Sequence, residues 1–102
     1  MTFAVKQEKF EGPLDLLLEL IDKEKLSINE ISLAKVADDY IAYVKSLEKI
    51  NPEALAEFLV VAAYLCLIKS RSLLPSLQIS EEEEESLEEL AKRLEEYKQI
   101  KE

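Results

Sequence analysis

The side chains best suited to catalytic chemistry are scarce in this sequence. The chain has one cysteine, Cys66, and no histidine. A catalytic thiolate needs a neighbouring base or positive charge, whereas Cys66 lies between Leu65 and Leu67. We therefore expect Cys66 to be a small buried hydrophobic residue, and a single cysteine cannot form a disulfide within the chain.

Carboxylates are abundant, but their positions predict solvated helix faces. Asp38 and Asp39, for example, fall on the outside of a predicted helix. Without histidine, and with one cysteine, the chain lacks the common ligand sets for zinc. The only glycine, Gly12, precedes Pro13, which excludes a glycine-rich loop for phosphate. The sequence thus predicts a protein that is not an enzyme and that needs no metal or cofactor.

The composition predicts one acidic globular domain of 102 residues, of which 48% are hydrophobic. A net charge of −9 argues against direct DNA binding, because neutralisation of phosphates dominates DNA affinity. The longest apolar run, at 58–68, is about half the length that spans a bilayer. The first residues lack the pattern of a secretion signal. We therefore expect a cytoplasmic protein without a membrane segment.

Hydrophobic periodicity predicts an all-α fold, a small bundle of about four helices. After an extended segment at 1–11, the first helix begins at Gly12-Pro13, because proline is tolerated at the first helical position. Ser27 and Glu30 have the spacing of a capping box and predict a short helical turn. Ser32 is then expected to cap the second full helix.

The third helix is predicted to be long. Asn51 and Pro52 supply its cap and first position, and it runs over 54–74 until Pro75 ends it. Ser80 and Glu83 form a further capping box that opens a fourth helix.

The third helix is hydrophobic on nearly all sides. At about 100° per residue, one arc is expected to face the core; it contains Leu55, Phe58, Leu59, Ala62, Leu65 and Cys66. A second apolar group lies on or beside the opposite arc: Val60, Tyr64, Leu67 and Ile68. A helix that is apolar all round is buried all round. The second face is therefore covered either by a protein partner or by another part of this chain, such as the fourth helix.

Two separated motifs resemble the signatures of one family. Residues 10–21 resemble the opening signature of segregation and condensation protein A, the prokaryotic kleisin, and read FEGPLDLLLELI. Residues 57–65 and 68–75 resemble its second signature, and read EFLVVAAYL and IKSRSLLP. The intervening segment 28–43 is similar in pattern and length, so the resemblance covers about residues 3–75.

The resemblance implies a non-enzymatic subunit of the prokaryotic SMC condensin complex, which acts in chromosome condensation and segregation. Residues 1–75 are then the domain that packs on the coiled-coil neck of an SMC ATPase. Residues 76–102 are an acidic helical linker, and the segment after residue 75 recruits segregation and condensation protein B. The family's C-terminal winged helix, which binds the head of the other SMC subunit, lies outside this chain. The resemblance further implies a cytoplasmic, nucleoid-associated protein that meets DNA only through the complex.

The spare apolar face and the resemblance together predict the residues that contact the SMC neck. They are Val60, Tyr64, Leu67, Ile68 and Arg71. Tyr64 can bury its ring and keep its hydroxyl in water. Arg71 either pairs with a carboxylate of the neck or is simply solvated.

Two other functions remain open. Residues 27–37 resemble the start of a helix-turn-helix, which would suit a DNA-binding domain. A DNA reader would carry basic residues on the following helix. That helix instead balances three lysines with three acids, so the basic surface is missing; they are Lys35, Lys45 and Lys49 against Asp38, Asp39 and Glu48. The third possibility is an acidic adaptor for an unrelated partner.

Overall fold

The computed structural model describes residues 10–47 and 49–101. These residues form four helices and no strand, which confirms the predicted all-α bundle. The helices are α1 (Pro13–Lys23), α2 (Glu30–Ser46), α3 (Pro52–Leu73) and α4 (Glu81–Lys101), and α3 is the longest. The extended segment expected at 1–11 lies almost entirely outside the described residues. Phe10, which is described, packs edge-on against the ring of Tyr43 with 5.3 Å between ring centroids.

Helix α1 begins at Pro13, as predicted. It ends in a Schellman motif, in which two backbone N–H groups satisfy the last carbonyls of the helix. The N–H of Lys25 donates to the carbonyl of Asp22, and the N–H of Leu26 donates to the carbonyl of Ile21, both at 3.0 Å. Lys25 therefore adopts the left-handed conformation, with φ of 58°.

The start of α2 differs from the prediction. The cap is Asn29, whose side-chain oxygen accepts a hydrogen bond of 2.8 Å from the backbone N–H of Ser32. Ser32 is therefore the third residue of the helix, and residues 27–29 form no separate helical turn. Asparagine and serine cap helices about equally well, so the local sequence did not distinguish Asn29 from its neighbours.

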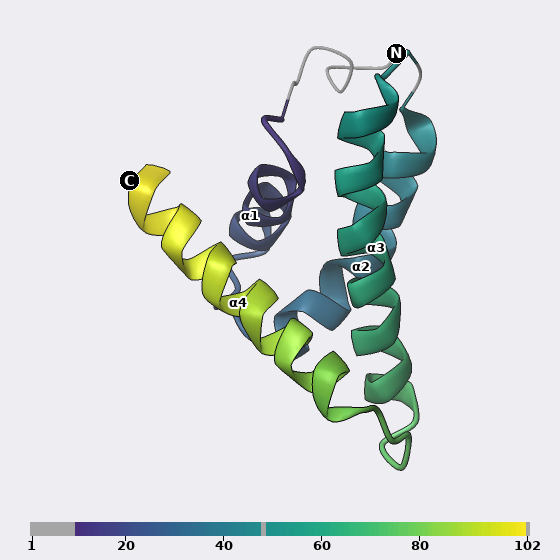
Figure 1. The fold of residues 1–102 in the computed structure, drawn as a ribbon. Helices are drawn as coiled ribbons and strands as arrows, with labels where there is room; N and C mark the ends of the chain where they lie inside the picture. Colours follow the sequence, from purple (N-terminus) through teal and green to yellow (C-terminus); the bar gives the residue numbers. More distant parts are fainter. Residues whose placement is uncertain (1–9, 48, 102) are drawn as a thin grey trace.

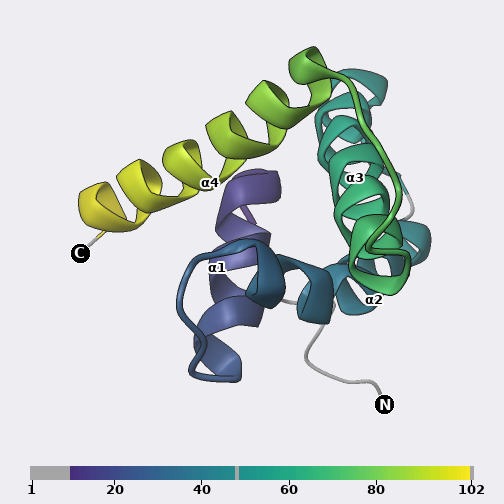
Figure 2. The same ribbon diagram turned by 90° about the horizontal axis from the view of Figure 1, so that it is seen from below.

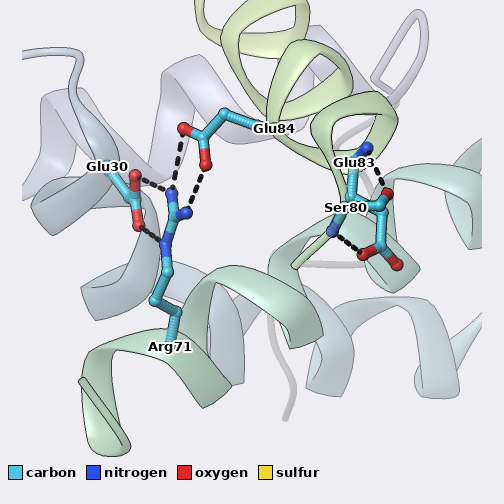
Figure 3. Close-up of polar contacts among 5 residues, drawn as sticks. All are labelled: Glu30, Arg71, Ser80, Glu83 and Glu84. Atoms are coloured by element: carbon cyan, nitrogen blue, oxygen red, sulfur yellow. Dashed lines mark hydrogen bonds and ion pairs between the residues drawn. The ribbon is translucent and has the colours of Figure 1, made fainter. Parts of the chain in front are cut away.

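The predicted caps of α3 and α4 are confirmed. The side chain of Asn51 accepts a hydrogen bond of 2.8 Å from the N–H of Ala54, and Pro52 is the first residue of α3. At the start of α4, the Ser80 hydroxyl accepts from the N–H of Glu83, and the Glu83 carboxylate accepts from the N–H of Ser80 (Figure 3).

The four helices surround one hydrophobic core. Helices α2 and α3 pack side by side, and α1 lies between α3 and α4 (Figure 1). Helix α4 leaves the turn at 74–80 and diverges from α3, so its main contact is with α1 (Figures 1 and 2). Leu87, Leu90 and Leu94 of α4 are buried in the same core as the leucines of α1. The fourth helix therefore packs against α1 and α3 in the shared core, and the proposed domain boundary at residue 75 stays a prediction.

The core-facing side of α3 is rotated from the predicted arc by about 80°, less than one residue step. The buried side chains are Phe58, Val61, Leu65 and Ile68. Leu59 is 50% exposed, and Cys66 is exposed and carries a free thiol, so the prediction that both face the core was wrong. Because α3 is apolar on nearly all sides, its periodicity does not select one face, and the contacts with α1 and α2 decide it.

Candidate protein-binding groove

A groove of about 670 Å³ lies between α3 and α4, beside the start of α1. Most of its apolar lining comes from aliphatic and aromatic side chains on all three helices. These residues are Pro13 and Leu14 from α1, Val60, Val61 and Tyr64 from α3, and Leu90 and Tyr97 from α4. Val60 is 53% exposed, so the groove leaves apolar surface in contact with water.

The structure separates the predicted contact residues into two groups. Val60 and Tyr64 line the groove; Val60 is exposed, and Tyr64 is partly buried against the core. Leu67 is partly buried against the core, and Ile68 is 1% exposed within it. Ile68 is therefore a core residue of this fold and offers no surface to a partner. Other parts of this chain therefore cover Ile68 fully and Leu67 in part, which is the alternative to a protein partner that the sequence left open.

Arg71 connects three helices. Its guanidinium donates hydrogen bonds of 2.9 and 2.6 Å to the carboxylate of Glu30 on α2 (Figure 3). It also donates a hydrogen bond of 2.5 Å to Glu84 on α4. These hydrogen bonds raise the pKa of Arg71, and the bond from Arg71 lowers the pKa of the Glu84 carboxyl. Arg71 thus forms ion pairs with two carboxylates of its own chain, a role that the sequence did not indicate.

A second set of polar contacts fixes the far end of α4 to the start of α1. The ammonium of Lys101 lies 2.5 Å from the carboxylate of Asp15, whose side chain is 10% exposed. The hydroxyl of Tyr97 donates a hydrogen bond of 3.1 Å to Glu11. Burial raises the pKa of Asp15, but hydrogen bonds from Lys101 and the Glu11 N–H outweigh this effect and lower it overall. Helix α4 is therefore held to the rest of the fold at both ends.

The rim of the groove is acidic. Four carboxylates line it, from Glu11, Asp15, Glu57 and Glu89, against one guanidinium, from Arg93. Arg93 pairs with Glu89 at 3.1 Å, and Asp15 is neutralised by Lys101. Among the described residues, Glu11 and Glu57 have no basic ion-pair partner.

The sequence did not indicate the α4 wall of this groove. A signal was available, because Leu90, Arg93 and Tyr97 have the spacing that places side chains on one face of a helix. Pro13, which was expected to open the first helix, also lines the groove together with Leu14. Only tertiary packing brings these residues opposite Val60.

No metal site is evident within residues 10–47 and 49–101, where no three His, Cys, Asp or Glu side chains are grouped as ligands would be. In the same part of the chain, none of the helices has both the length and the apolar character needed to cross a membrane.

The comparison with known families decides the relationship. The family model described as segregation and condensation protein ScpA matches residues 20–102, which is most of the chain. The chain belongs to this family. The match includes the second motif, at 57–65 and 68–75, and extends through α4, whereas most of the first motif, at 10–21, precedes it.

Curated relatives named segregation and condensation protein A match nearly the whole chain. The relative from Caldanaerobacter subterraneus subsp. tengcongensis is 44% identical over 104 residues, covering 98% of this chain and 42% of the relative. The relative from Bacillus licheniformis is 43% identical over 108 residues, covering 99% of this chain and 43% of the relative. The relative from Clostridium tetani is 43% identical over 105 residues, with 99% and 41% covered. The chain thus spans about two-fifths of the length of these segregation and condensation proteins.

Proposed function

We propose that this chain is the N-terminal module of a kleisin subunit and binds the coiled-coil neck of an SMC ATPase. The module acts by helix packing, without catalysis, in chromosome condensation and segregation. The observation that carries the proposal is the groove lined by the exposed Val60 and the partly buried Tyr64. Both residues belong to the second motif of a chain in the segregation and condensation protein A family.

Helix packing gives this groove a physical reason to bind a coiled coil. Val60 is 53% exposed, and completing its burial gains about 1 kcal/mol. Several such gains are needed, because association also costs translational and rotational freedom. Tyr64 adds a large ring whose hydroxyl can stay in water at the rim.

Burial supports a shorter list of proposed contacts. We propose that Val60 and Tyr64 touch the neck and that Leu67 lies at the margin of the contact. Ile68 and Arg71 act from inside the chain, by holding α3 against its neighbours.

The wider assembly is part of the same proposal. The segment after residue 75 recruits segregation and condensation protein B. The chain itself contacts DNA only indirectly, through the complex. The module then works in the cytoplasm, at the nucleoid. The family name supports this placement, because it describes proteins of chromosome segregation and condensation.

Calorimetry with an SMC head-and-neck fragment from the same organism tests the proposal. We expect the wild-type chain to bind and both Val60→Glu and Tyr64→Glu to lose most of the affinity, because each buries a charge in the contact. Ala63→Glu is the matched control, because Ala63 is exposed on α3 and does not line the groove. All variants must keep wild-type helicity by circular dichroism. A folded wild type that does not bind would refute the proposed function.

A further inference from the structure

We propose that α4 is the second wall of the binding site and that the groove accepts one amphipathic helix with lysine or arginine beside its apolar stripe. This inference rests on the proposed function, because the helix in question belongs to the same partner. It adds that α4 takes part in recognition and that the charge of the rim selects the partner.

The first argument is the arrangement of apolar side chains. Val60 and Tyr64 on α3 face a space whose opposite side carries Tyr97 on α4, beside the nearly buried Leu90. Two helices that diverge above a third leave a trough with apolar side chains on both sides. A helix placed there can contact both walls through residues spaced three and four apart. A single flat face on α3 would offer contacts on one side only.

The second argument is that the α4 wall is already in place. Leu87, Leu90 and Leu94 are each at most 5% exposed, so α4 is anchored in the core along its length. Glu84 ties its first turn to Arg71, and Lys101 ties its last turn to Asp15. A partner therefore meets a preformed groove and does not have to order a loose helix, which removes an entropic cost.

The third argument is charge. The guanidinium of Arg93 forms an ion pair with Glu89. Glu11 and Glu57 lie on the rim and have no basic ion-pair partner in the described part of the chain. Acidic side chains at such a rim steer basic partners during encounter and disfavour acidic ones. A helix with lysine or arginine on either side of its apolar stripe would place these cations near Glu57 on one wall and Glu11 at the start of α1.

The test of the wall uses the same SMC head-and-neck fragment and a residue that is neither in the core nor in an ion pair. Ser86 on α4 lines the groove, so Ser86→Trp would fill the trough from the α4 side. We expect this variant to bind at least tenfold more weakly, whereas Glu88→Trp on the outer face of α4 binds as wild type. If Val60→Glu abolishes binding but Ser86→Trp does not weaken it, α4 is no wall. The proposed function would then stand and this inference would fall.

The test of charge uses paired reversals. Glu57→Lys with Glu89→Lys changes the rim, and Glu88→Lys with Glu95→Lys makes the same change in net charge on exposed positions outside the lining. We expect the rim pair to weaken binding about tenfold, mainly through the association rate, with a reduced dependence on salt. The control pair should change binding by less than threefold. Equal effects of the two pairs would overturn the basic-helix assignment.

A last experiment asks whether α4 forms part of the binding site or covers the groove and competes with the partner. Glu84→Gln with Lys101→Met removes the ion pairs that hold the two ends of α4. A wall that loses its supports binds the fragment more weakly, which is our expectation. Tighter binding by this variant would mean that α4 competes with the partner for the groove, and the inference would be wrong.

Discussion

The hydroxyl group of Tyr40 on α2 donates a hydrogen bond of 2.8 Å to the backbone carbonyl of Phe58 on α3. The Tyr40 side chain is fully buried, and the two rings lie 6.3 Å apart. Burial raises the pKa of Tyr40 well above its ordinary value, so the hydroxyl stays protonated and donating. This contact joins α3 to α2 at Phe58, two residues before Val60 in the groove.

Removing this hydroxyl should lower stability moderately. We expect Tyr40→Phe to cost about 1 kcal/mol of unfolding free energy, because one buried hydrogen bond is lost while the ring stays in place. Tyr40→Ala should cost about 3–5 kcal/mol, because it also leaves a cavity. Urea unfolding followed by circular dichroism measures both. A Tyr40→Phe variant as stable as wild type would show that the hydroxyl contributes only position.

The Schellman motif after α1 predicts a stabilising substitution. Lys25 holds φ at 58°, a conformation that costs an L-residue about 1–2 kcal/mol. Lys25→Gly should therefore raise stability by about 0.5–1 kcal/mol, after allowing for the greater flexibility of glycine in the unfolded chain. Lys23→Gly, inside the last turn of α1, is the matched control and should lower stability instead. Thermal unfolding of the two variants compares them, and a loss of stability in both would contradict the motif's role.

Acid should loosen α4 before the rest of the fold. The pKa values of Asp15 and Glu84 are lowered from ordinary values of 3.8 and 4.5, so their stabilising contribution is complete above those values. It is lost as the pH falls through the lowered pKa values, because the unfolded chain then binds more protons than the folded one. With no histidine in the chain, we expect nearly constant stability between about pH 6 and 8.

Hydrogen exchange of α4 amides across the acid range measures this effect. Protection should fall in α4 at a higher pH than in α2 and α3. The double variant Asp15→Asn with Glu84→Gln supplies the control, because it should be less protected at neutral pH and depend less on acid. The opposite dependence holds for Lys101, whose pKa is raised by its hydrogen bond to Asp15, so its contribution is lost only at strongly alkaline pH. Simultaneous loss of protection in all helices would contradict a separate α4 response.

The exposed thiol of Cys66 gives a direct check on the orientation of α3. Because Cys66 lies outside the core, a thiol reagent should modify it in the folded protein nearly as fast as in urea. Cys66→Ser should change stability by less than about 0.5 kcal/mol, as expected for a surface position. Ile68→Ser, with a side chain that is 1% exposed, should cost several times more. Protection of Cys66 in the folded chain would support the sequence-based orientation of the helix instead.

The sequence predicted the features of this fold that depend on neighbouring residues. The cap at Asn51 and the box at Ser80 and Glu83 follow from short-range hydrogen bonds, and the structure confirms both. The cap of α2 was misplaced because Asn29 and Ser32 are comparable caps only three residues apart. Local spacing thus found each helix but could not always select its first residue.

Capping motifs and helical spacing do not predict contacts between residues that are far apart in the sequence. Arg71 and Glu30 are 41 positions apart, and Lys101 and Asp15 are 86 positions apart. Every helix of this acidic chain carries exposed acids, so no spacing rule could select Glu30 and Glu84 as the partners of Arg71. The burial of Ile68 was missed for a related reason, because all sides of α3 are apolar enough to enter a core. The side of α3 that stayed open, at Val60 and Tyr64, became visible only when α1 and α4 were in place.

The divergence of α3 and α4 from the turn at 74–80 gives α4 the properties of a lever. Its 21 residues span about 30 Å, so a pivot of about 10° at Glu81 shifts the region of Lys101 by about 5 Å. The Arg71–Glu84 pair lies close to the pivot and keeps its geometry, whereas the Lys101–Asp15 pair lies at the far end and opens. The contacts at the far end therefore resist such a pivot most strongly: Leu94 in the core, the Tyr97–Glu11 hydrogen bond and the Lys101–Asp15 ion pair.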